Sequence, residues 1–246
     1  MCGLERGWYH SEPRLIASRE EARKSIKTIE LGSLVTAALV HFQLANVPVF
    51  VMLRPHSKMS YCFTDIDMEC ITNDMRTFRE NGADGFVFGA LVGREIDFEK
   101  CRIIADHAHG LPLTFHRAFD MSIPSKQFEN LRKISECGYQ RVLTSGFAKT
   151  AEDGIEVLKN LNEYAIQNQL ASIMPGCGVN VLNAERILRE TGCKEYHGSA
   201  KMQKVLDIPA TDSDTFAISE EIRKASFSVT EKRTVAELVA VGKRFL

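Results

Sequence analysis

Histidine, arginine and aspartate residues stand at the ends of short apolar runs in this chain. The run PLTFH leads into His116, Arg117 and Asp120, and the run EYH ends in His197. Imidazole groups can move protons near neutral pH, and a guanidinium can hold a carboxylate or phosphate through two parallel hydrogen bonds. These residue types predict acid–base chemistry on a small anionic molecule, with His116, His197 and Asp120 as candidate catalytic groups.

Further candidate ligand-binding positions end other apolar runs. Thr144 opens the turn TSG, and Gly176 and Gly178 lie in the turn PGCG. Glycine-rich turns can leave backbone N–H groups free to meet an anion. The complete predicted ligand-binding set is Glu30, Arg54, Arg117, Thr144, Gly176, Gly178 and Ser199.

Donor atoms for a soft metal ion occur at the same run ends. Cys177, Met174, His116 and His197 could supply sulfur and imidazole nitrogen, which suit Cu(I). Their spacing matches no recognised ligand motif, and a methionine in an apolar run is more typical of a core. The residues alone therefore leave the identity of any metal ligand open.

Composition narrows the class of protein and its partners. The formal net charge of −1 gives no basic face for nucleic acid, and no apolar run is long enough to span a membrane. The seven cysteines include no CxxC pair, and the first residues lack the apolar core of a secretory signal. We therefore expect reduced thiols and a cytoplasmic protein without nucleic-acid or membrane partners. A homo-oligomer is compatible with the sequence.

Seven short β-rich runs alternate with amphipathic helical stretches. The runs are continuously apolar rather than alternating, which is typical of parallel strands buried on both faces. Three helical stretches stop at a glycine just before the next run, in NGADG, CGYQ and TGCK, as a left-handed helix end requires. The predicted strands are Lys27–Leu31, Pro48–Leu53, Gly85–Phe88, Pro112–His116, Arg141–Thr144, Ser172–Met174 and Glu195–His197.

This alternation predicts an α/β fold, a parallel (β/α)8 barrel of the TIM type whose first strand is degraded or missing. We expect one domain over residues 1–246, with a divergent N-terminal segment over 1–25. An open doubly wound or flavodoxin-like sheet is the alternative, but no GxGxxG follows the first strand. We also expect helices over Ser33–Ala45 and Val229–Phe245 and a loop over Asp207–Ser219.

Several strings resemble the CutC copper-homeostasis family, in order from about residue 47 to residue 201: VPVFVMLRP, NGADGFVFGAL, LPLTFHRAFDM, RVLTSG, MPGCG and EYHGSA. The resemblance implies a TIM barrel, a cytoplasmic location and a role in copper handling, with Cu(I) as the implied ion. The positions that carry over are Glu30, Arg54, His116, Arg117, Asp120, Thr144, Gly176, Gly178, His197 and Ser199.

The chain departs from the family pattern at its cysteines. Cys177 replaces the middle glycine of the family's MPGGG. The family's IELC reads IELG here, with Gly32 in place of cysteine, and its opening strand, like EVCVDS, has no counterpart. The cysteine pair that is linked to Cu(I) in the family's animal members therefore does not carry over.

Three hypotheses follow from the sequence. The first is a copper-homeostasis protein that handles or binds Cu(I). The second is a TIM-barrel enzyme that acts on a small anionic metabolite, with His116 and His197 in acid–base roles and Arg54 holding the anion. The third is a degraded family member whose missing strand leaves an exposed sheet edge.

Overall fold

Five parallel strands form the central sheet of the computed structural model, which describes residues 48–54, 61–205 and 226–245. Their order in the sheet is their order along the chain. They are short and almost wholly buried, as strands that are covered on both faces must be. The strands are β1 (Phe50–Met52), β2 (Gly85–Phe88), β5 (Leu113–Phe115), β6 (Arg141–Thr144) and β7 (Ser172–Pro175).

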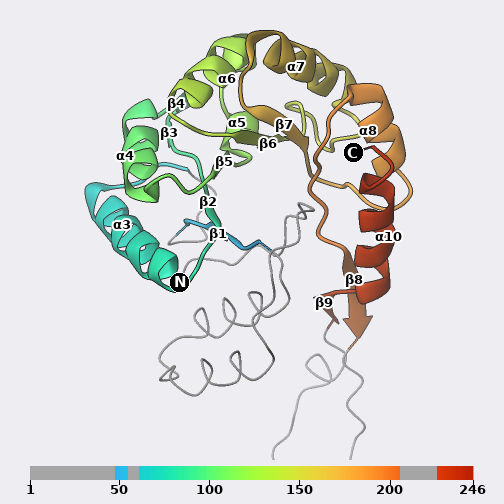
Figure 1. Cartoon of the computed structure of the whole chain (residues 1–246). Coiled ribbons are helices and arrows are strands. Elements are labelled where there is room, and N and C mark those ends of the chain that lie inside the picture. The colour runs from blue at the N-terminus through green and yellow to red at the C-terminus, as the bar shows by residue number, and fades with distance from the viewer. Residues whose placement is uncertain (1–47, 55–60, 206–225, 246) are drawn as a thin grey trace, which may run out of the picture.

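Helices lie along the outer face of this curved sheet (Figure 1). Each helix follows one parallel strand, leads the chain back to the sheet, and turns a stripe of apolar side chains inward. On α3 this stripe consists, as its helical period predicts, of Met68, Ile71, Met75 and Phe78. The covering helices are α3 (Asp65–Glu80), α4 (Phe98–Ala108), α6 (Gln127–Glu136), α7 (Ile155–Asn168) and α8 (Ala184–Thr191). The short α5 (Ala118–Met121) and a 3-10 turn, η1 (Pro124–Lys126), follow β5.

The two faces of the sheet carry separate apolar clusters. Successive residues of a strand point to opposite faces, so Val51 packs in the cluster under the helices while Phe50 belongs to a smaller one on the other face. That smaller cluster consists of Phe50, Val87, Leu143 and Met174. Met174 is only 1% exposed, so it is a core residue.

The predicted pattern, in which a helix ends at a glycine and the chain then returns to the sheet, is confirmed. Gly82, Gly138 and Gly192 all have φ between 69° and 89°, and Gly192 is the left-handed C-cap of α8. A residue with a Cβ is strained there, so glycine lets each helix end sharply and turn back to the sheet. The predicted α/β fold on a parallel sheet is confirmed for the described residues.

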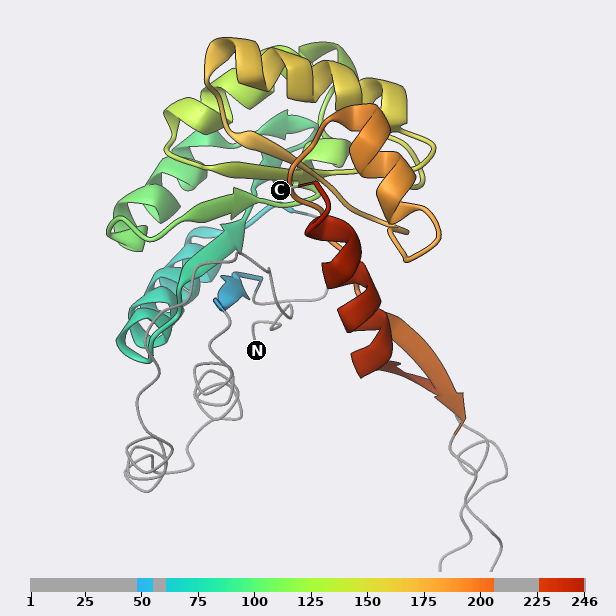
Figure 2. The ribbon, with the colours of Figure 1, turned by 45° about the vertical axis from the view of Figure 1, so that its right-hand side comes forward.

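Two antiparallel hairpins were not among the predicted elements. The hairpins are β3–β4 (Leu91–Val92 and Glu95–Ile96) and β8–β9 (Lys201–Val205 and Ser226–Thr230). The second hairpin runs away from the sheet beside α10 (Lys232–Gly242) (Figure 2). The predicted helix from Val229 therefore starts too early, because the β-prone residues SFSVT pair with β8 and the side chain of Glu231 caps α10 at Thr234 N.

The predicted strand at Glu195–His197 is a single parallel bridge rather than a strand. His197 N donates to Pro175 O at 2.8 Å, and His197 pairs with Gly176 beside β7. This segment thus takes the next place in the sheet order. The predicted strand over 27–31, the helix over 33–45, the segment 1–25 and the loop over 207–219 lie outside the described residues. Among the described helices, none has both the length and the hydropathy to cross a membrane.

Candidate functional site

The carboxyl ends of the parallel strands bring several predicted site residues to one edge of the sheet. Arg54 lies just after β1, and His116 and Arg117 follow β5 directly. Register pairs join β1 to β2 and β2 to β5, so these strand ends are neighbours. We name the group Arg54, Tyr61, His116, Arg117 and Asp120 the strand-end rim.

Asp120 is the centre of a hydrogen-bond network within the rim. Its carboxylate accepts from Arg117 Nε at 2.8 Å, from the hydroxyl of Thr144, and from the backbone N–H groups of Ser145 and Phe147. The side chain is only 5% exposed. Asp120 is thus committed to internal partners, which gives it a positioning role toward Arg117 and leaves little capacity to accept a substrate proton.

The turn after β6 differs from the expectation that its backbone N–H groups are free. Ser145 N and Phe147 N donate to Asp120, and Gly146 N donates to Thr144 Oγ1 at 2.9 Å. Thr144 itself is fully buried. The protein's own carboxylate, which lies in α5, therefore fills the place where an external anion was expected.

Arg117 keeps donors for a ligand. Its Nε donates to Asp120 and its Nη2 donates to Ser145 Oγ at 2.9 Å, so three of its five N–H groups have no partner among the described residues. Burial lowers the pKa of this guanidinium, but the hydrogen bond and charge of Asp120 outweigh burial, and the pKa lies above its ordinary value. Arg117 is a fixed cation with its side chain 36% exposed.

His116 is a buried, neutral ring at the end of β5. It is 2% exposed, and burial, with the nearby charge of Arg54, lowers its pKa from 6.5 to about 3. Ala118 N donates to His116 Nδ1 at 3.2 Å, so the ring proton belongs on Nε2, which has no partner among the described residues. At neutral pH His116 is therefore a hydrogen-bond donor rather than a general base.

Two residues that the sequence reasoning did not select complete the surroundings of His116. The ring of Tyr61 lies between the guanidinium of Arg54, 4.9 Å from the ring centroid, and the ring of His116, at 4.7 Å. Gly89, the residue after β2, faces the ring, and a Cβ there would come within 2.8 Å of His116 Nδ1. Tyr61 carried no signal in the sequence, whereas Gly89 is recognisable there as the glycine that ends the predicted strand Gly85–Phe88.

The turn after β7 lies farther along the sheet. Cys177 has a φ of 83°, and its thiol donates to Lys149 O at 3.3 Å. Gly176 packs against Leu143, and a Cβ there would lie 2.4 Å from Leu143 Cδ1, so that side chain would have to shift. Gly178 also has a left-handed φ, of 76°. Cys177 is near enough to Arg117 to raise the pKa of that guanidinium, so this turn borders the rim.

His197 is placed apart from His116. The strands β6 and β7 separate them, which corresponds to about three strand spacings of ~4.8 Å along the sheet. No contact joins the two rings in the part of the chain that the structure describes. Ser199 is exposed beyond His197, and Glu30 lies outside the described residues. The structure thus gathers Arg54, His116, Arg117, Asp120 and Thr144, and it leaves His197 and Ser199 at the edge.

The described residues contain no cluster of three metal ligands. Within 48–54, 61–205 and 226–245, no three His, Cys, Asp or Glu side chains are arranged to hold a metal ion. Burial raises the pKa of the Cys101 and Cys193 thiols to about 12, so they stay protonated and are poor ligands at neutral pH. The strand-end rim contains two arginines and no thiol.

Comparison with known proteins gives the family. The CutC family model matches residues 28–202. A copper homeostasis protein cutC homolog of Drosophila melanogaster is 42% identical over 63% of this chain and 59% of its own length. The homolog of Homo sapiens is 36% identical over 83% of this chain and 74% of its own length. The match therefore spans less than two thirds of the fruit-fly protein.

A solved structure agrees with these relatives. The crystal structure of a CutC protein from Streptococcus agalactiae superposes with a TM-score of 0.63 at 30% identity, over 68% of this chain and 79% of that one. This likeness, with the parallel sheet and its helices, confirms the TIM-type α/β fold. On the family model and the relatives together, this chain belongs to the CutC family.

Proposed function

We propose that this chain acts in copper homeostasis and that its direct ligand at the strand-end rim is a small anionic molecule. The first half rests on the names of the fruit-fly and human relatives. The second half rests on one observation: Arg117 is a partly exposed cation at the rim, and three of its five N–H groups have no partner among the described residues. An anion can accept from these groups.

The charge balance of the rim supports an anion rather than a cation. Asp120 is already hydrogen-bonded to Arg117, and burial, with the charge of Arg54, keeps His116 neutral. A carboxylate or phosphate oxygen would receive charge-assisted hydrogen bonds from Arg117. Such donors also stabilise an oxyanion that forms during a reaction, so the enzyme hypothesis remains, with Arg117 as the donor.

Direct binding of Cu(I) is the second form of the proposal, and it has less support in the described residues. Family membership favours it. The protonated buried thiols and the two rim arginines count against it. A cytoplasmic location belongs to the same proposal, because the cysteines lack a CxxC pair and the sequence predicts reduced thiols.

Ligand binding at the rim can be tested with defined probes. Inorganic phosphate, malonate and succinate would be titrated against the full chain while the melting temperature is recorded. A rim ligand should raise the melting temperature saturably in the wild type, and Arg117→Lys should weaken binding about tenfold because a lysine cannot form the two-pronged contact. Arg102→Gln is the matched control, since Arg102 is exposed on α4. Equal binding by Arg117→Lys and wild type would reject the rim assignment.

The copper proposal needs two separate measurements. Cells that lack the chain should differ from matched cells in copper content or in copper tolerance, and no difference in either would reject a role in copper homeostasis. Titration of the reduced protein with Cu(I) against a competing chelator decides whether the chain itself binds the copper ion. Stoichiometric binding tighter than micromolar would support a bound copper ion and contradict the anion-only view of the rim.

A further inference from the structure

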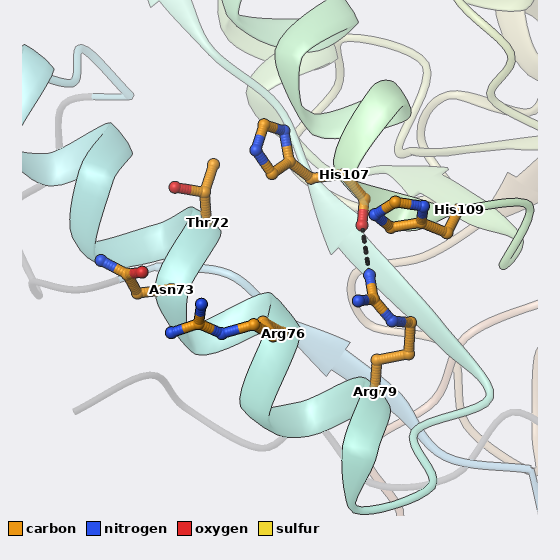
Figure 3. A pocket seen from close by; sticks show the side chains of 6 residues that line it. All are labelled: Thr72, Asn73, Arg76, Arg79, His107 and His109. Carbon is orange, nitrogen blue, oxygen red and sulfur yellow. Dashed lines mark hydrogen bonds between the residues drawn. The ribbon is translucent and has the colours of Figure 1, made fainter.

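A hollow of about 150 Å³ lies between α3 and α4, away from the strand-end rim (Figure 3). Both helices lead at their ends into the start of the next strand, so the later turns of α3 and the end of α4 lie toward the amino ends of the strands. The rim lies at the opposite, carboxyl ends. The side chains that line the hollow are Thr72, Asn73, Arg76, Arg79, His107 and His109.

The lining is cationic and contains no carboxylate. Within the described ranges, Arg76 and Arg79 form no ion pair. On α6 and α8, by contrast, arginines pair with a glutamate one turn away, as in Arg132–Glu136 and Arg186–Glu190. Two arginines thus line the hollow without a negative partner from the described chain, Arg76 on the side of Asn73 and Arg79 on the side of His107 (Figure 3).

The hydrogen bonds of the lining leave mostly donors for a ligand. Arg79 Nη1 donates to His107 O at 3.1 Å, which joins α3 to the last turn of α4 and leaves four N–H groups on Arg79. The hydroxyl of Thr72 donates to Glu69 O, so its proton is already used. Arg76 has all five of its N–H groups without a described partner.

We propose that this hollow binds the phosphate group of a small phosphorylated molecule. Two guanidiniums offer more donors than one carboxylate can accept, whereas a phosphate presents oxygens in several directions. A water needs about 15 Å³ of such space, so the hollow has room for about ten waters, enough for a phosphate and part of its substituent. The proposal goes beyond the rim and does not depend on it.

A purely structural explanation covers only part of the lining. Histidines at the end of α4 complement the negative end of the helix dipole, and the bond from Arg79 satisfies a terminal carbonyl. Neither reason applies to Arg76, which stands one turn earlier on α3 and makes no described bond. Arg76 is therefore the lining residue whose substitution tests the phosphate site most directly.

Phosphorus NMR and calorimetry on the full chain test the site with inorganic phosphate and phenyl phosphate. We expect saturable binding with a dissociation constant of about 1 mM or below, and a loss of about tenfold in Arg76→Gln. Arg102→Gln, an exposed arginine of α4 outside the hollow, should bind as the wild type does. Tighter binding of phenyl phosphate than of inorganic phosphate would identify a phosphate ester as the ligand, and the reverse would identify the free ion.

The rim variant separates the two sites. Arg117→Lys should leave binding at the hollow unchanged, because Arg117 lies at the other end of the sheet. If Arg76→Gln binds phosphate as the wild type does, or if Arg117→Lys abolishes all binding, the phosphate belongs to the rim and the hollow is not a site. The far-ultraviolet circular dichroism of each variant confirms that it is folded. Absence of any saturable binding to the wild type would also overturn the proposal.

Discussion

His116 determines how the rim can handle a proton. The ring is buried, and the N–H of Ala118 donates to Nδ1, so protonation would place a charge on a ring that is only 2% exposed. The charge of Arg54 adds to this cost. The sequence predicted a catalytic histidine here, and the geometry gives it a narrower chemistry, that of a neutral donor.

The free energy of unfolding should therefore fall as the pH drops below the ordinary pKa of histidine. The unfolded chain takes up a proton near pH 6.5, whereas folded His116 does so only near pH 3, so acid favours the unfolded state throughout that window. The loss from this residue is about 1.4 kcal/mol per pH unit, or ~2 kcal/mol between about pH 7 and pH 5. Urea unfolding of the wild type and of His116→Asn at both pH values measures it.

His116→Asn is informative because its side-chain oxygen can still accept from Ala118 N while the titrating group is gone. The variant should lose about 2 kcal/mol less than the wild type over the same pH interval. The other histidines are present in both proteins and cancel in this difference. Identical pH dependence of the two proteins would show that His116 is not held neutral by the fold.

At the scale of single residues, the sequence identified the residue types and one alternative, that Asp120 is the structural partner of Arg117. The structure has that pair and joins Thr144 to the same internal network. Which donor meets which acceptor depends on how α5 lies against the turn after β6, and spacing along the chain carries no such information. Tyr61 was overlooked for the same reason, since its role comes from its neighbours.

Among the elements, α3 has the most complete start signal. Its N-cap Thr64 accepts from Asp67 N, and the carboxylate of Asp67 in turn accepts from Thr64 N at 2.8 Å. This reciprocal capping box satisfies backbone donors that the first turn of a helix otherwise leaves open. The helix then presents its apolar stripe to β1 and β2 and forms one wall of the hollow between α3 and α4.

Thr64→Ala should lower the free energy of unfolding by about 1 kcal/mol, because it removes the side-chain acceptor for Asp67 N. Urea denaturation at neutral pH measures the change. Thr77→Ala is the matched control, since Thr77 is exposed within the same helix and alanine is a better helix former. A Thr64→Ala protein as stable as the wild type would mean that water replaces the cap without cost.

The sequence predicted regular elements well and irregular pairings poorly. Apolar period and terminal glycines located the strands and the helices that cover them, because burial on one face imposes the period directly. The hairpin of β8 with β9 was not predicted, since its strands are far apart in the chain and polar on most positions of β8. The segment ending at His197 has strand-like residues, but only one residue pairs with β7.

For the whole molecule, the inner face of the sheet is linked across several strands by one charged side chain. Arg141 at the start of β6 donates from Nε to Glu195 at 2.5 Å, and its guanidinium lies 5.2 Å from the ring centroid of Phe50 on β1. The side chains of Arg141 and Glu195 are 13% and 20% exposed. The pair therefore connects β1, β6 and the segment after α8 at the end of the sheet opposite the rim.

Glu195→Ala should destabilise the chain by about 3 kcal/mol, because it leaves the guanidinium of Arg141 largely buried without a counter-charge. Arg141 Nη1 already lacks a described partner, so none of the described residues is at hand to compensate. The double variant Arg141→Met/Glu195→Leu should recover most of that loss, since an apolar pair avoids the cost of burying charge. Urea unfolding of the wild type, of Glu195→Ala and of the double variant measures the loss and the recovery in the free energy of unfolding. If the double variant is no more stable than Glu195→Ala, the pair holds the sheet segments together through its bonds, and apolar packing against Phe50 cannot replace it.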